Sequence, residues 1–173
     1  MKSLLRYSIG LFSLGLVLTF IGSVSAQAQT DKDITEIRSQ VAAINKGVAK
    51  YKKVTKDVDD VSLEGAEATY YRSGEDLKKI TTRMYGETYK ATGEFYYRDG
   101  ELIFGFIKHS QYDTQIGLSK PVKVIRVEER RYYFAGGVLI KLMVGKKTLK
   151  SDSEKYSQLK DEIIDISGKL TAQ

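Results

Sequence analysis

The sequence contains no cysteine, and this absence removes two means by which exported proteins are commonly held in place. A disulfide cannot staple the fold. A bacterial lipoprotein anchor cannot form either, because it needs a cysteine just after the N-terminal apolar stretch. The chain of 173 residues must therefore be stabilised by its apolar core alone.

Catalytic and metal-binding side chains are also scarce, since His109 is the single histidine. A catalytic triad or a zinc site would need further partners, and no nucleophile elbow or phosphate-binding glycine loop is present. The acids Asp57, Asp59 and Asp60 lack the glycine and the additional oxygen ligands of a calcium loop. We therefore expect no cofactor, no metal and no enzyme, and we expect His109, near Lys90, to be a structural or surface residue.

Positive charge is present but not concentrated. The chain has 28 basic and 22 acidic residues, for a formal net charge of +6. A nucleic-acid binder usually carries a dense basic stripe, so we expect no nucleic-acid partner.

The N-terminal segment has the order of a secretory signal peptide. Lys2 and Arg6 supply charge, residues 9–21 are mostly apolar, and small residues follow. The run is shorter than the roughly 20 residues of a spanning helix, although an uncleaved anchor is the alternative. We predict a signal peptide at 1–26, cleavage after Ala26 or Ala28, and a periplasmic or secreted single α+β domain at 27–173 with no membrane span.

Two segments have the apolar spacing of amphipathic helices. Residues 33–51 follow Thr30, a suitable N-cap, and the C-terminal segment follows Ser151 and Glu154, which match a capping box. Both helices are predicted to pack on one face of a sheet; a partner-binding or dimerising seam is the alternative. The apolar positions are Ile34, Ile37, Val41, Ile44, Val48 and Tyr51, then Tyr156, Leu159, Ile163, Ile166 and Leu170.

Between these helices the motif Tyr-Tyr-x-x-Gly occurs three times, at 70–74, 96–100 and 132–136. Each copy precedes apolar sequence and so predicts a strand, a tight turn and a strand. The result is a six-stranded antiparallel meander, with Gly86 as a further turn. The predicted strands are 65–72, 76–85, 87–98, 101–112, 122–134 and 138–144.

The middle copy predicts a register, because Asp99-Gly100 favours a two-residue hairpin turn. The third copy could turn at Ala135-Gly136 or Gly136-Gly137, and the first copy is expected to have a longer turn. In the middle copy, Arg98 should face Glu101 and Tyr97 should face Leu102. Strict alternation then pairs Tyr96 with Ile103, Phe95 with Phe104, Glu94 with Gly105, Gly93 with Phe106 and Lys90 with His109.

The Tyr-Tyr-x-x-Gly hairpins resemble those of exported bacterial proteins of uncharacterised function and, loosely, the tandem hairpins of MORN-like and YwqK-like repeat proteins. The resemblance covers about 65–144. The three copies start 26 and 36 residues apart and lack the regular glycines of true MORN repeats. The resemblance implies hairpin geometry and no particular functional residue.

The tyrosines give the leading functional hypothesis. Neighbouring tyrosines point to opposite faces of a sheet, so Tyr97 and Tyr133 are predicted to be core. Tyr96 and Tyr132 would then form an exposed strip, with Arg130 and Lys90, that binds an envelope protein or a glycan. The expected function is a non-enzymatic binding or structural module of the bacterial cell envelope. The alternatives are a carrier of an apolar ligand and an envelope hydrolase.

Overall fold

The structure, a computed structural model, describes residues 22–117 and 121–172. A helix, an eight-stranded antiparallel sheet and a second helix follow one another along the chain, and the strands lie in sequence order. The α+β meander is confirmed, with eight strands instead of six, and most of the predicted signal peptide lies outside the described residues. The elements are α1 (Gly22–Gly47), a 3₁₀ turn (Val48–Lys50), β1 (Lys52–Val58), β2 (Ala66–Ser73), β3 (Asp76–Gly86), β4 (Tyr89–Arg98), β5 (Glu101–Tyr112), β6 (Val124–Ala135), β7 (Val138–Val144), β8 (Lys147–Thr148) and α2 (Glu154–Thr171).

The two unpredicted strands lie at the edges of the sheet. β1 pairs only with β2, and all of its residues except Lys56 and Val58 are exposed. An edge strand with three lysines lacks the alternation of apolar and polar residues that identifies a half-buried strand. β8 is two residues long and pairs with the end of β7.

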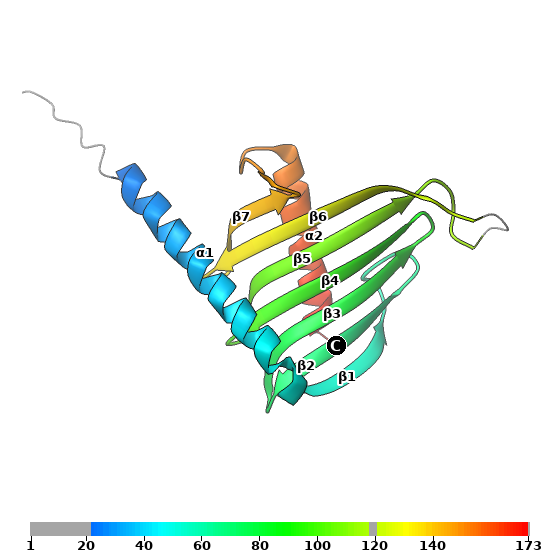
Figure 1. Ribbon diagram of the computed structural model, residues 1–173, viewed down its shortest axis with the longest axis horizontal. Helices are drawn as coiled ribbons and strands as arrows, with labels where there is room; N and C mark the ends of the chain where they lie inside the picture. The colour runs from blue at the N-terminus through cyan, green and yellow to red at the C-terminus, as the bar shows by residue number, and fades with distance from the viewer. Residues whose placement is uncertain (1–21, 118–120, 173) are drawn as a thin grey trace, which may run out of the picture.

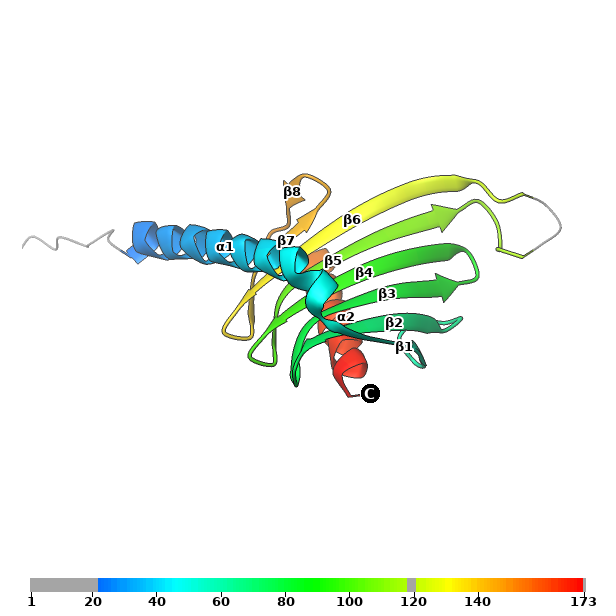
Figure 2. The same cartoon turned by 60° about the horizontal axis from the view of Figure 1, so that its bottom comes forward.

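The two helices lie on opposite faces of the sheet, which contradicts the prediction that they share one face (Figures 1 and 2). α1 buries Ile34, Ile37 and Ile44 against a face that includes Tyr96 and Tyr133. α2 packs on the other face, where a larger core contains Phe95, Tyr97 and Tyr132 and the helix residues Leu159, Ile163, Ile166 and Leu170. Each helix keeps the predicted apolar stripe, but two amphipathic stripes cannot reveal whether they face the same layer.

The helix ends also differ from the prediction. α1 is continuous from Gly22 and does not begin at Thr30, and it contributes no buried side chain before Ile34 among the described residues. The N-cap of α2 is Ser153, whose hydroxyl accepts a hydrogen bond from the Tyr156 amide, and not Ser151. In the described part of the chain, neither helix is both long and apolar enough to cross a bilayer.

A β-bulge in each tyrosine hairpin explains why the predicted register fails beyond the turn. Asp99-Gly100 forms the turn with φ of 52° and 83°, and Tyr97 faces Leu102 as predicted. Tyr96 then faces Phe104, so Ile103 is an extra residue and every following pair shifts by one. The same shift follows the turns at Gly136-Gly137 and Gly74-Glu75, and the latter turn is short, not long.

The bulges also change which tyrosines share a face. Because an extra residue reverses the alternation beyond it, Tyr96 and Tyr133 both face α1, whereas Tyr97 and Tyr132 face α2. Tyr97 and Tyr133 are buried as predicted, although they lie on opposite faces, whereas the prediction that Tyr96 and Tyr132 are exposed is wrong.

Candidate functional site

The structure does not bring the four predicted binding residues together on an exposed surface. Tyr96 is 2% exposed and Tyr132 is 0% exposed, because α1 and α2 cover them from opposite sides. Lys90 is exposed on the face that carries α1, where its ammonium lies 5.9 Å from the centre of the Tyr85 ring. Arg130 lies on the face that carries α2. The predicted exposed aromatic strip is therefore wrong, although Arg130 belongs to the cleft described next.

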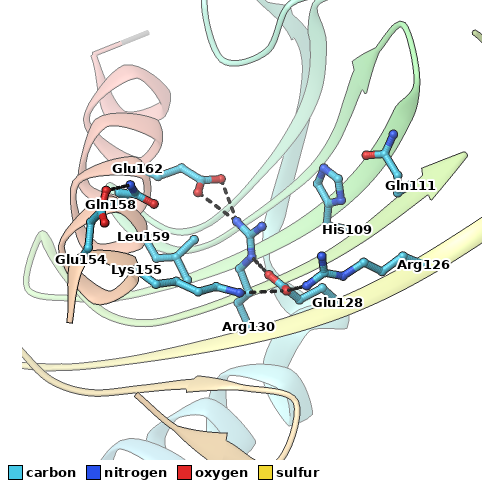
Figure 3. A pocket seen from close by; sticks show the side chains of 10 residues that line it. All are labelled: His109, Gln111, Arg126, Glu128, Arg130, Glu154, Lys155, Gln158, Leu159 and Glu162. Carbon is cyan, nitrogen blue, oxygen red and sulfur yellow. Dashed lines mark hydrogen bonds and ion pairs between the residues drawn. The ribbon is translucent and has the colours of Figure 1, made fainter. Parts of the chain in front are cut away.

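A cleft of about 510 Å³ lies between the first turns of α2 and the adjoining parts of β5 and β6. Figure 3 shows side chains from the helix and from the sheet facing each other across it. Three basic and three acidic side chains contribute to its lining, so its formal charge is balanced. The lining residues are His109, Gln111, Arg126, Glu128, Arg130, Glu154, Lys155, Gln158, Leu159 and Glu162.

The alternation of side chains along a strand and the three-to-four-residue spacing along a helix face bring the residues of the cleft together. Arg126, Glu128 and Arg130 are two residues apart on β6 and so point to the same face. The cross-strand partner of Glu128 is His109. On α2, Lys155, Leu159 and Glu162 are three or four residues apart, so they share the helix surface that faces the strands.

Glu128 is the centre of the ion-pair network. Its side chain is 9% exposed, and its carboxylate accepts bonds from three cations: Arg130 Nε at 2.7 Å, Arg126 Nη2 at 2.6 Å and Lys155 Nζ at 3.1 Å. Burial alone would raise the pKa of this carboxyl, but the bonds from Arg130 and Lys155 outweigh burial and hold the pKa at about 2. The carboxylate is therefore ionised throughout the physiological pH range.

Arg130 joins the sheet to α2. Its Nη1 donates to both carboxylate oxygens of Glu162, at 3.0 and 2.9 Å, while its Nε donates to Glu128. The Arg130 side chain is 14% exposed, so these bonds are shielded from water more than those of a surface pair. By contrast, Arg126 and Lys155 have side chains that are 68% and 46% exposed, and they share one oxygen of Glu128.

His109 lies beside this network and stacks on Tyr89, with 4.8 Å between the ring centres and 22° between the ring planes. Burial lowers the pKa of His109, the positive charge of Arg130 lowers it further, and Glu128 opposes part of the shift. This shift favours the neutral imidazole, in which one ring nitrogen can donate a hydrogen bond to a ligand and the other can accept one.

The opposite face of the sheet contains a second polar cluster, beneath the last turn of α1. Lys79 is 8% exposed and donates to Asn45 Oδ1 at 3.0 Å, Glu94 Oε2 at 2.7 Å and the Tyr96 hydroxyl at 2.9 Å. The single proton of the Tyr96 hydroxyl is directed to Glu94, and Asn45 Oδ1 lies 3.1 Å from the same hydroxyl. Although burial opposes charge on both groups, their mutual hydrogen bond leaves the pKa of Lys79 raised and that of Glu94 lowered. The cluster links Asn45 of α1 to Lys79 and Tyr96 of the sheet.

Sequence reasoning named Arg130 as a candidate binding residue but did not predict the cleft around it. The available signal was the alternation Arg126-x-Glu128-x-Arg130 on one strand, which predicts an ion-paired row on one face. The matching acids and lysine on α2 could not be assigned to that row, because the face covered by α2 was unknown.

The chain was compared with protein-family models, with curated proteins and with solved structures, and none of the three comparisons gave a match.

Proposed function

We propose that this chain is an exported, non-enzymatic binding module of the bacterial cell envelope, in the periplasm or outside the cell. Its binding site is the cleft between α2 and strands β5 and β6, and its ligand is small, polar and anionic. The observation that carries this proposal is the sharing of one Glu128 oxygen by two exposed cations, Arg126 and Lys155.

These two cations have unused donors. The Arg126 guanidinium has five N–H groups and the Lys155 ammonium has three, and each makes one hydrogen bond among the described residues. A carboxylate or phosphate group between them would accept charge-assisted hydrogen bonds. Glu128 would keep its bond from the buried Arg130. Ligand binding would therefore not leave the buried Glu128 carboxylate without a cation.

The remaining lining also favours a polar ligand. His109 and Gln111 offer neutral hydrogen-bonding groups, and Glu154 and Glu162 on α2 can accept from hydroxyl or amine groups. An ionic lining of this kind favours a polar ligand over the apolar ligand of the carrier hypothesis. A carboxylate with a pKa of about 2 is a weak general base at neutral pH, which favours binding over hydrolysis.

The test is a titration of the ¹⁵N-labelled protein with acetate, with inorganic phosphate and with the neutral sugar methyl glucoside, followed by amide chemical shifts. We expect saturable shifts around Gln111, Arg126 and Glu128 with at least one of the two anions, and none with the sugar.

The double variant Arg126→Gln, Lys155→Gln should abolish these shifts. The control variant is Lys160→Gln, which removes an exposed lysine of α2 that does not line the cleft, and it should retain them. Binding that survives in the double variant, or no saturable shift with either anion, would contradict the proposed site.

A further inference from the structure

His109 is the side chain of the cleft whose charge can change near neutral pH. It is the single histidine of the chain, which also has no cysteine. Histidine is the only side chain with an ordinary pKa between about pH 5 and pH 8, and the α-amino group, at about 7.7, is the other group that titrates there. Proton uptake that accompanies ligand binding in this range therefore identifies His109, once the α-amino group is controlled for.

The fold places this imidazole in the same cleft as the two cations of the proposed anion site. His109 lies on β5 opposite Glu128 of β6, and it lines the cleft together with Arg126 and Lys155. Figure 3 shows its ring on the sheet side of the cleft, with Arg130 between it and α2 in this view. An anion held by Arg126 and Lys155 would therefore share a partly enclosed space with the ring, where charges are screened less than at an open surface.

The ring nitrogens of His109 are available for binding. Within residues 22–117 and 121–172, the ring is held by its stacking on Tyr89, and neither nitrogen makes a hydrogen bond. Polar atoms that serve only the fold are usually hydrogen-bonded when they are buried. A free imidazole nitrogen can instead accept a proton and then donate it in a hydrogen bond to a ligand.

The surroundings of the ring oppose its protonation in the ligand-free protein. The Glu128 carboxylate, opposite the ring, is already paired with three cations. Burial lowers the pKa of His109, the positive charge of Arg130 lowers it further, and Glu128 opposes part of this shift. The titratable and charged groups around the ring are Tyr89 on β4, Arg126, Glu128 and Arg130 on β6, and Glu154, Lys155 and Glu162 across the cleft on α2.

A bound anion would reverse this balance. Its negative charge would offset the positive charges of Arg126 and Lys155, and an opposite charge within about 4–6 Å favours the charged form of a titratable group. The imidazolium would in turn donate a charge-assisted hydrogen bond to the anion. Each event therefore favours the other, which is the condition for coupling between them.

We propose that His109 couples anion binding in this cleft to the uptake of one proton from the solvent. The ligand then meets three cationic donors, Arg126, Lys155 and His109, and it is released as the pH rises. The coupling rests on the proposed anion site, and it adds the condition under which that site binds and releases its ligand.

The first test follows the imidazole directly in the full ¹³C-labelled chain, because a single histidine gives one Cε1–Hε1 signal. Its pH titration is recorded at constant ionic strength, without ligand and with saturating acetate or sulfate, whose charges stay constant between about pH 5.5 and about pH 8. We expect the anion to raise the pKa of the imidazole. Because coupling is reciprocal, the Kd of the same anion should be about tenfold larger at about pH 8 than at about pH 5.5.

The second test removes the titrating group. His109→Gln keeps a neutral hydrogen-bonding side chain but cannot take up a proton, so its affinity for the anion should no longer depend on pH. Lys160→Gln is the matched control, because Lys160 is exposed on α2 and does not line the cleft, and it should keep the pH dependence of the parent. Both variants retain the α-amino group.

The possible outcomes separate the coupling from the anion site itself. Saturable binding with a pH-independent Kd and an unmoved imidazole pKa would overturn the coupling and leave the anion site standing. A pH dependence that persists in His109→Gln would also overturn the coupling, since another group would then take up the proton. No saturable binding at any pH in this range would overturn both.

Discussion

At the scale of single residues, the interior contains hydroxyl groups that the fold does not use. The Thr82 and Tyr132 hydroxyls are buried and make no hydrogen bond among the described residues. Thr82 lies in the core under α2, opposite Gly93, where a methyl group on Gly93 would come within 2.6 Å of Thr82 Oγ1. The missing side chain at Gly93 thus leaves room for the Thr82 hydroxyl, which makes no hydrogen bond among the described residues.

Replacing Thr82 with valine should therefore stabilise the protein. The two side chains have the same shape, and removal of an unpaired buried hydroxyl removes a desolvation cost of about 1 kcal/mol. Denaturant unfolding is the measurement, and Thr92→Val, at an exposed position on the opposite face, should change the free energy of unfolding by less. A Thr82→Val variant that is less stable than the parent would indicate that this hydroxyl has a partner, such as a buried water.

Glu128 should make the stability of the protein depend on pH in the acid range. Its pKa of about 2 lies below the ordinary value of 4.5, so its contribution to stability is complete above about pH 4.5 and is lost as the pH falls through 2. The contribution is at most on the order of 3 kcal/mol.

Glu128→Gln should be less stable than the parent at pH 7 and should have a flatter stability profile between pH 4.5 and 2, measured by urea unfolding. Glu129→Gln is the control, because Glu129 forms a more exposed ion pair with Arg131 and contributes less. Equal slopes in the parent and in Glu128→Gln would show that the ion-pair network does not stabilise the fold.

At the scale of elements, the sequence was sufficient for six strands, two helices and the turn at Asp99-Gly100, because period-two alternation and turn residues are local signals. It was not sufficient for the bulges at Lys78, Ile103 and Ile140, since an extra residue in a strand of apolar side chains leaves no local mark. These bulges decide which tyrosines are buried under which helix. The bulges explain why the tyrosines were assigned to the wrong faces, whereas the helix was misplaced because an apolar stripe does not reveal which face of a sheet it covers. The site could not be located without both pieces of information.

The attachment of α1 to the sheet depends on Lys79. Lys79→Met should lower the free energy of unfolding by about 1–3 kcal/mol, because Asn45 loses its bond from the ammonium and Glu94 loses its cation. It should also increase amide hydrogen exchange in the last turns of α1 more than in α2.

The matched control for this prediction is the neighbouring lysine. Lys78 is the bulge residue, and its ammonium forms one ion pair within the described part of the chain, with the exposed Asp76 at 3.4 Å. Lys78→Met should leave the exchange of α1 unchanged. If the two variants have the same exchange pattern, the buried cluster does not fix the helix.

At the scale of the whole molecule, the predicted signal peptide can be compared with the start of α1. α1 begins at Gly22, and from Gln27 onward, where burial is described, its first buried side chain is Ile34. Cleavage after Ala26 or Ala28 would therefore remove only helix that contributes nothing to the described core.

We predict that the exported protein begins at Gln27 or Gln29. Intact-mass spectrometry of the protein from the periplasm or the culture medium measures this directly. Replacement of Ala26 and Ala28 by bulky residues should leave the precursor uncut and membrane-associated. Recovery of the full-length mass from wild-type cells would favour the uncleaved anchor.

The order of the strands has a consequence for how the chain folds. Because each strand pairs with its neighbours in sequence, the sheet can form hairpin by hairpin with short loop closures, and such topologies fold quickly for β proteins. The exception is the side under α2, where the Tyr70 hydroxyl donates to the Leu170 carbonyl, 100 residues away. A chain synthesised from its N-terminus leaves that side, with Ile107, Tyr132 and Leu142, open to water until its last residues are released. This interval is the period when the nascent protein most needs protection by a chaperone.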